Sequence, residues 1–276
     1  MLPAETLSAA TQECLRDDLR RLGVRPGDLV MVHASLRKIG LARTEYGEGG
    51  AEALLDALDA AVGPAGTLMM VLGSHYKLDW VNRRPVAERA GLLAGTEPLD
   101  PASVGAVPEV GWMAEAFRRR PGTLVSTNPS GRFGARGRLA ESMLRAQPWH
   151  DYYGPGSPLQ KLCDAGGRVL RLGADPETVT VLHYSEYLAH LPVKRRARWD
   201  YMLNGDNGPR HMWMACLDDS EGIVPWEGED YFAVILKAFL KTGRARSGRV
   251  GTADSELIEA ADLVDFGAHW MEAHLG

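Results

Sequence analysis

The sequence predicts an α/β fold, a single domain over residues 1–276 in which a central mixed sheet is flanked by helices. Short apolar runs rich in β-branched residues alternate with longer segments of helical periodicity, and Gly- and Pro-containing turns separate them. No internal repeat and no linker-like shift in composition divides the chain. With 276 residues, 45% of them hydrophobic, the chain is long enough to bury a large core.

The pattern of the N-terminal part predicts a helix followed by a strand, and helices and strands then continue to alternate. Residues 5–22 carry apolar positions at helical spacing, and the turn at 23–27 ends them. The β-rich run at 29–32 predicts a strand, and its polar continuation at 33–37 predicts the strand's exit. The same patterns then predict a helix at 49–62, a strand at 67–72 and a helix at 109–119.

The stretch 73–107 has no strong periodicity, and a loop that long in a compact domain is usually functional or disordered. We expect it to face a substrate. The remaining patterns predict helices at 137–147, 157–165, 178–191, 230–241 and 254–274, a strand at 168–172, and a hairpin that joins 195–203 to 210–217.

Charge and cysteine content exclude several classes of protein. The net charge of −5 lacks the basic footprint of a nucleic-acid partner and better suits a cationic ligand. Cys14, Cys163 and Cys216 are odd in number and widely spaced, which excludes a disulfide framework and a paired-cysteine metal site. No apolar run has the length of a membrane helix and no leader pattern is seen, so we expect a cytoplasmic monomer or homodimer without a membrane partner.

The strongest candidate for catalysis is His183, in the first turns of the helix that follows the strand predicted at 168–172. Open α/β sheets bind their ligands at this position. Four polar side chains share one face of that helix, at spacing i, i+3, i+4 and i+7: His183, Glu186, Tyr187 and His190. Glu186 can orient the imidazole and stabilise its protonated form, as a general base requires. The alternative is a structural His–Glu pair.

Other motifs are weaker or absent. A zinc site of His183, Glu186 and His190 lacks the H-E-x-x-H spacing, and its histidines are two turns apart. The chain contains no G-x-G-x-x-G, P-loop or G-x-S-x-G motif. At the exit of the first strand, amides, the Ser35 hydroxyl and two cations suit a phosphate or pyrophosphate, although a solvated turn explains them equally.

Taken together, the motifs resemble the aminoglycoside 3-N-acetyltransferase family over nearly the whole chain. Eight ordered segments carry the resemblance: 22–28, 33–37, 63–68, 120–122, 128–130, 153–158, 182–186 and 257–267. The resemblance implies the antibiotic N-acetyltransferase fold, acetyl coenzyme A as the donor, an aminoglycoside antibiotic as the acceptor, and no metal. Two departures stand out: 125–129 reads Val-Ser-Thr-Asn-Pro where many members have Arg-Ser-x-His-Pro, and 73–107 lacks the family's usual acidic and aromatic pattern.

The resemblance also implies roles for residues of this chain. It maps the catalytic histidine onto His183, with Ser185 and Glu186 matching the residues that follow it. The residues implied for coenzyme A are Ser35, Leu36, Arg37 and Lys38, with Ser126 and Phe133. A polycationic acceptor needs carboxylates, and the candidates in irregular regions are Asp79, Glu109, Asp218 and Asp230.

Sequence and resemblance predict the same mechanism. An amine is protonated near pH 7, so its attack on a thioester needs a base, which we expect to be His183 supported by Glu186. We expect direct transfer in a ternary complex rather than an acyl-Cys163, because that cysteine has no activating neighbour in sequence. Two alternatives stay open: a non-catalytic protein that sequesters aminoglycosides, and a related acetyltransferase that acts on another amine.

Overall fold

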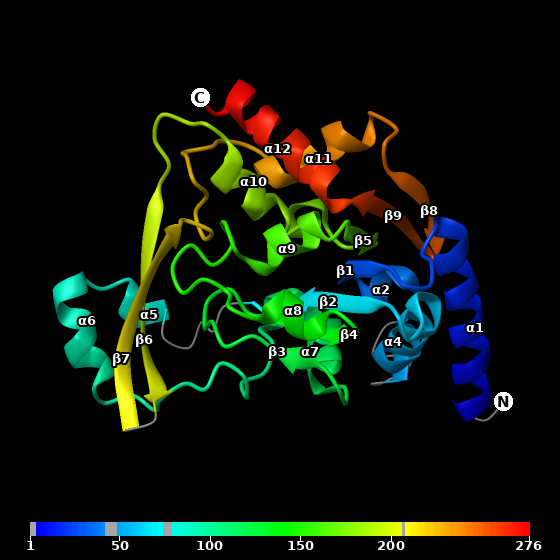
Figure 1. Ribbon diagram of the computed structural model, residues 1–276, viewed down its shortest axis with the longest axis horizontal. Helices are drawn as coiled ribbons and strands as arrows, with labels where there is room; N and C mark the ends of the chain where they lie inside the picture. The colour runs from blue at the N-terminus through cyan, green and yellow to red at the C-terminus, as the bar shows by residue number, and fades with distance from the viewer. Residues whose placement is uncertain (1–3, 42–48, 74–78, 206–207) are drawn as a thin grey trace.

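A mixed sheet forms the centre of the molecule (Figure 1). In a computed structural model that describes residues 4–41, 49–73, 79–205 and 208–276, seven strands follow the order β3-β4-β2-β1-β5-β9-β8. The central strands β1 (Leu29–Ala34), β2 (Thr67–Val71) and β5 (Arg168–Leu172) are parallel. Antiparallel strands complete both sides: β3 (Leu124–Val125), β4 (Phe133–Gly137), β8 (Arg246–Val250) and β9 (Ala253–Glu259).

Helices cover both faces of the sheet. One face packs against α1 (Ala4–Leu22), α4 (Gly49–Val62) and α7 (Gly111–Arg119). The other face packs against α8 (Ala140–Leu144), α9 (Pro158–Asp164), α10 (Leu182–Leu188), α11 (Tyr231–Leu240) and α12 (Ala260–His274). Because strand side chains alternate, Val30 of β1 joins the first core and Met31 the second. None of the helices in the described segments has the length and apolar composition needed to cross a membrane.

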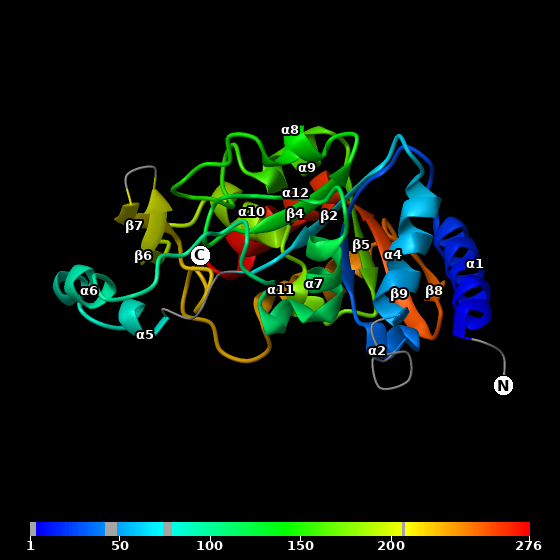
Figure 2. The ribbon, with the colours of Figure 1, turned by 90° about the horizontal axis from the view of Figure 1, so that it is seen from below.

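A long hairpin stands at the end of the molecule opposite α1 (Figures 1 and 2). It consists of β6 (Arg196–Gly205) and β7 (Gly208–Leu217), and α5 (Asp79–Asn82) and α6 (Val86–Leu93) pack beside it. The buried Asp200 carboxylate accepts hydrogen bonds from Arg89 at 3.0 Å and from Arg198 and His211 at 2.9 Å. Hairpin residues belong to the same hydrophobic core as α10, which supports the expectation of one domain.

The predicted α/β fold with a mixed central sheet is confirmed, and so are most of its elements. Two expectations were wrong. The aperiodic stretch 73–107 contains α5 and α6, and residues 254–259, expected to be helical, belong to β9. Pairing along the whole of β5 explains the second error, because hydrogen bonds to a neighbouring strand override local helix propensity. The sequence patterns also missed β3, β4 and β8.

A buried arginine fixes the loop that leads to η2 (Pro108–Val110) and α7. Arg132 is 0% exposed, and its guanidinium donates to the carbonyl oxygens of Pro101 at 3.0 Å, Val104 at 2.6 Å and Gly105 at 2.9 Å. Burial lowers the pKa of Arg132 to about 10, which still leaves the group charged near pH 7. Charge-assisted hydrogen bonds to three carbonyls therefore replace its hydration.

Replacing Arg132 with Met is expected to lower the free energy of unfolding by about 2–4 kcal/mol, because the variant leaves buried carbonyl groups without donors. Urea denaturation measures the change. The matched control is Arg138→Met, since Arg138 is exposed and donates only a long bond of 3.3 Å to Ala65. Equal stabilities of the two variants would contradict the structural role of Arg132.

Candidate active site

The turn after β5 directs the chain toward the site. Gly173 follows the strand with a φ of +63°, a conformation that favours glycine. A Cβ atom there would lie 2.8 Å from the Cβ atom of Ala253 and 3.0 Å from that of Lys38. The chain then passes through η3 (Pro176–Thr178) and enters α10, whose second residue is His183.

The structure brings His183 and Glu186 together. The Nδ1 atom of His183 lies 2.8 Å from the Oε2 atom of Glu186, as expected for residues one turn apart. Glu186 is 1% exposed, and the Tyr231 hydroxyl of α11 donates to its other oxygen, Oε1. With Nδ1–H donating to the carboxylate, the neutral imidazole keeps the lone pair of Nε2 available as a base.

Aromatic rings hold the imidazole in place. The Tyr153 ring stacks on it at a centroid distance of 4.8 Å and an interplanar angle of 11°, and Phe232 meets it edge-on at 4.8 Å. Burial alone would lower the pKa of His183, but the charge and hydrogen bond of Glu186, with the charges of Asp219 and Asp230, raise that pKa above its ordinary value.

His183 lies where two cavities meet. The larger cavity, of about 850 Å³, extends from the end of β1 past η2 and α7, and the smaller one, of about 410 Å³, lies between α10 and the start of α11. Both are lined by Glu177, His183 and Asp219. Residues from different parts of the chain therefore form one continuous site around His183.

The two cavities differ in charge. The smaller one is lined by five carboxylates, without a Lys or Arg among its described residues: Glu177, Glu186, Asp219, Glu221 and Asp230. The larger one has mostly apolar walls, and its described lining includes one Arg, Arg37, together with four carboxylates: Glu109, Asp175, Glu177 and Asp219. A cation is therefore better accommodated in the smaller cavity, and an elongated ligand with an anionic end in the larger.

A second histidine, His33, lines the larger cavity from the end of β1. It is 6% exposed, and burial, together with the nearby charge of Arg171, lowers its pKa to about 4. His33 is therefore neutral near pH 7, in contrast to His183, whose pKa is raised.

Among the residues implied for coenzyme A, Ser35, Leu36 and Arg37 line the larger cavity. Ser35 also caps α2 (Leu36–Ile39), because its hydroxyl accepts from the Lys38 amide. The Lys38 ammonium pairs instead with Asp175 at 2.5 Å.

Ser126 and Phe133, also implied for coenzyme A, are buried, and the Ser126 hydroxyl accepts from the Phe133 amide at 2.9 Å. They brace the connection between β3 and β4, and neither is among the lining residues of the two cavities.

The predicted acceptor carboxylates lie at separate places. Asp230 lines the smaller cavity and caps α11 by accepting from the Phe232 amide at 2.7 Å, whereas Glu109 lines the larger cavity. Asp218 is buried and accepts from the amides of Ser220 and Glu221 at 3.1 Å, so it caps a turn and lines neither cavity. Asp79 is the first residue of α5, and its side chain lies outside the described part of the structure.

Sequence reasoning missed Tyr153 and Tyr231 as residues of the site, and it did not single out Asp219 among the acidic residues of 218–230. Tyr153 lies in the turn-rich segment 153–158, where the pattern indicated only a helix cap. Asp219 has the same residue type as Asp218, and their different directions depend on the turn that follows β7. Tyr231 carried no local signal, because its partner Glu186 is 45 residues away.

The described residues do not support the two alternative chemistries, a zinc site that includes His190 and an acyl-enzyme on Cys163. His190 is exposed, and its Nδ1 atom lies 2.8 Å from Glu272 rather than near His183. Among the described residues, no group of three His, Cys, Asp or Glu side chains is placed to hold a metal ion. Burial raises the pKa of the Cys163 thiol to about 12, which disfavours the nucleophilic thiolate.

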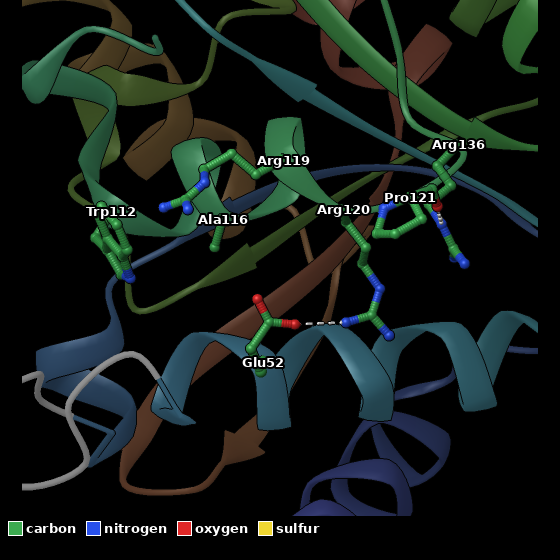
Figure 3. A pocket seen from close by; sticks show the side chains of 7 residues that line it. All are labelled: Glu52, Trp112, Ala116, Arg119, Arg120, Pro121 and Arg136. Carbon is green, nitrogen blue, oxygen red and sulfur yellow. Dashed lines mark hydrogen bonds and ion pairs between the residues drawn. The ribbon is translucent and has the colours of Figure 1, made fainter.

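A third cavity, of about 420 Å³, lies between α4 and α7 (Figure 3). Two of its three lining arginines are paired with carboxylates of α4: Arg120 contacts Glu52 at 2.8 Å and Asp59 at 3.0 Å, and Arg136 also pairs with Asp59. Its lining includes no histidine, cysteine or serine. The cavities around His183 are therefore the better candidates for catalysis.

Comparisons with known proteins agree with this geometry. The family model described as aminoglycoside 3-N-acetyltransferase matches residues 31–272. The aminoglycoside N(3)-acetyltransferase III of Serratia marcescens is 39% identical over 96% of this chain and 98% of its own, and type VII of Streptomyces paromomycinus is 39% identical over 96% and 93%.

Solved structures give the same result. The structure of AAC-IIIb as a binary complex with CoASH matches with a TM-score of 0.86 at 35% identity, over 95% of this chain and 96% of that chain. The structure of sisomicin-bound AAC-VIa matches with a TM-score of 0.84 at 32% identity, over 95% and 97%.

The Glu186→Gln variant is expected to lower the pKa of His183, because the substitution removes the largest of the charges that raise this pKa and leaves the burial that lowers it. NMR titration of the imidazole in both proteins measures the shift. A raised pKa stabilises the folded state at low pH, so the variant should lose most unfolding free energy, relative to the parent, at acid pH. Glu272→Gln, next to exposed His190, is the control and should leave His183 unchanged.

Proposed function

We propose that this acetyltransferase, which belongs to the aminoglycoside 3-N-acetyltransferase family, transfers an acetyl group from acetyl coenzyme A to the 3-amino group of an aminoglycoside. Both substrates are bound at once in a ternary complex, and the modification confers antibiotic resistance. In this proposal His183 is the general base and Glu186 orients it. The observation that carries the proposal is the position of His183 at the junction of two cavities, a large one with mostly apolar walls and a smaller one lined by five carboxylates. A reaction between two substrates needs its base at such a meeting point.

We assign the donor to the larger cavity. Its volume of about 850 Å³ and mostly apolar walls suit the pantetheine arm of coenzyme A. The guanidinium of Arg37, beside Ser35, is available for a phosphate group at one end. The relative that was solved with CoASH has the same fold, which supports this assignment.

We assign the acceptor to the smaller cavity. An aminoglycoside carries several ammonium groups near pH 7, and the five lining carboxylates attract them. The relatives solved with sisomicin support an acceptor of this class. Asp230 belongs to this wall, whereas the position of Glu109 associates it with the donor cavity.

The proposed reaction begins when the 3-ammonium group loses a proton to solvent water and becomes a nucleophile. The amine nitrogen attacks the thioester carbonyl carbon and its second proton passes to the Nε2 atom of His183. The new C–N bond replaces the C–S bond as the intermediate collapses, and the imidazolium returns its proton to the leaving thiolate. Glu186 stabilises the imidazolium through Nδ1, and the stacked Tyr153 ring preserves its orientation.

Direct transfer fits the cysteines better than an acyl-enzyme does. Cys163 lies on α9, and its raised pKa keeps the thiol protonated near pH 7. The thiol of Cys216 is buried, and burial likewise raises its pKa to about 12. The amine therefore reacts with the thioester itself, and both substrates must be bound at once.

His183→Ala is expected to reduce turnover by about 100-fold or more, the usual loss when a general base is removed. Release of the coenzyme A thiol with kanamycin, gentamicin or apramycin measures it. The matched control is His190→Ala, in the same segment but exposed and paired with Glu272. A variant that keeps more than half of the parent turnover would exclude His183 as the base.

The same assay separates the alternative functions. Thiol release with an aminoglycoside supports the proposed enzyme, whereas aminoglycoside binding without thiol release supports a sequestering protein. Thiol release only with other amines would identify a related acetyltransferase with a different acceptor.

Arg37→Ala is expected to raise the KM for acetyl coenzyme A by about 5-fold or more and to leave the KM for the aminoglycoside unchanged, because a charge-assisted contact to phosphate is lost. Lys38→Ala is the informative comparison, since Lys38 pairs with Asp175 and does not line the cavity. It should have the smaller effect. If only Lys38→Ala affects the donor, the phosphates bind outside the cavity.

A further inference from the structure

Two carboxylates line both cavities: Glu177, which is exposed, and Asp219, which is half-buried and has no Lys or Arg partner among the described residues. Asp219 follows the turn-capping residue Asp218 after β7 and lines both cavities beside His183. The Tyr152 hydroxyl donates to its Oδ2 atom at 2.6 Å, and Tyr152 is itself 0% exposed. In the described part of the chain, Asp219 has no ion pair with Lys or Arg and accepts from no side chain other than Tyr152. One oxygen is thus fixed in direction, and Oδ1 is left for a ligand.

The surroundings of this carboxylate favour a cation. Burial raises the pKa of Asp219, although the charge of His183 and the Tyr152 hydrogen bond oppose this effect. An ionised carboxylate that is partly removed from water is destabilised until a cation or hydrogen-bond donor reaches it. The opening of the site at Asp219 gives a ligand's ammonium group that access.

We propose that Asp219 binds the ammonium group of the amine that is to be acetylated and positions its nitrogen against His183. The inference rests on the proposed function, because it assumes that the acceptor occupies the smaller cavity. Glu186 is already engaged with the imidazole and Glu177 is exposed, whereas Asp219 lies at the junction, is half-buried and is oriented by Tyr152. After the ammonium loses its first proton, the amine still donates a hydrogen bond to Oδ1, which directs its lone pair toward the larger cavity.

The charge of Asp219 also acts on the base. The titratable groups around it are His183 and Glu186 of α10, Tyr152 and Tyr153 of the preceding turn, and Cys216 of β7. The raised pKa values of the two tyrosines and the cysteine keep them neutral near pH 7, so His183 and Glu186 are the partners whose charge matters. Removing the charge of Asp219 should therefore lower the pKa of His183.

The test compares Asp219→Asn with the parent enzyme by steady-state kinetics. The variant keeps the size of the side chain, and it is expected to raise the acceptor KM by about 10-fold or more, as when a cation loses a buried carboxylate partner. The KM for acetyl coenzyme A should stay within about 2-fold, because the variant leaves Arg37 and the apolar walls of the larger cavity unchanged. The acid limb of the kcat/KM profile should move to lower pH, a change that a purely structural role would not produce.

Two further variants make the test specific. Asp254→Asn is the matched control, since Asp254 lies outside both cavities with a side chain 90% exposed, and it should leave all three readouts unchanged. Tyr152→Phe frees the Oδ2 atom and should raise the acceptor KM by less than Asp219→Asn does. Thermal unfolding of each variant identifies those that are folded, and comparisons are made among these.

An unchanged acceptor KM and pH profile in folded Asp219→Asn would overturn the inference. A larger acceptor effect in Asp218→Asn would also overturn it, in favour of the neighbouring carboxylate. Calorimetric titration with tobramycin separates this failure from a failure of the proposed function. The proposed function fails, and the ammonium site stands, if the parent binds tobramycin without releasing thiol and Asp219→Asn weakens that binding 10-fold. Equal affinities of both proteins for tobramycin overturn the ammonium site.

Discussion

The arrangement of the site depends on the burial of one carboxylate. Glu186 is almost entirely removed from water, and a buried ionised carboxylate is tolerated only when its oxygens are hydrogen-bonded. His183 occupies one oxygen and Tyr231 the other, so α10 and the start of α11 must meet at a fixed distance and angle. The same requirement sets the ring orientation and the charge state of the imidazole. Packing, geometry and basicity at His183 therefore have a common origin.

The packing of α12 against α10 supports that arrangement on the side of α10 that faces away from the cavities. Gly267 lets the two helices approach closely, because a Cβ atom there would lie 2.7 Å from the Ser185 hydroxyl oxygen. That hydroxyl donates to the Val264 carbonyl at 2.9 Å. The helix that carries the dyad is thus anchored on its far side by backbone contact, while its near side faces the cavities. Rigid support of this kind preserves a base in its working orientation.

Local patterns in the sequence predicted the parts of the structure that local forces determine. The spacing of His183 and Glu186 on one helix predicted their contact, and the strand before them predicted their place at the sheet edge. The roles of Tyr231 and Asp219 depend on a distant partner and on the direction of a single turn, and neither is encoded in spacing. Strand β9 was misread for a similar reason, since its pairing with β5 joins segments far apart in the chain. The position of the Asp79 side chain could not be predicted either, because the acidic residues of a long aperiodic stretch show no spacing that predicts where their side chains lie.

The junction of the two cavities has a consequence for inhibition. Because both cavities contact Glu177, His183 and Asp219, a single molecule that fills both needs only a short rigid linker between its two halves. Tethering makes occupation of the second cavity an intramolecular event, which strengthens binding without any new contact. The cationic half would supply recognition and the apolar half would supply buried area. Substitutions at the junction that weaken the binding of such a compound would fall on His183 or on residues beside it.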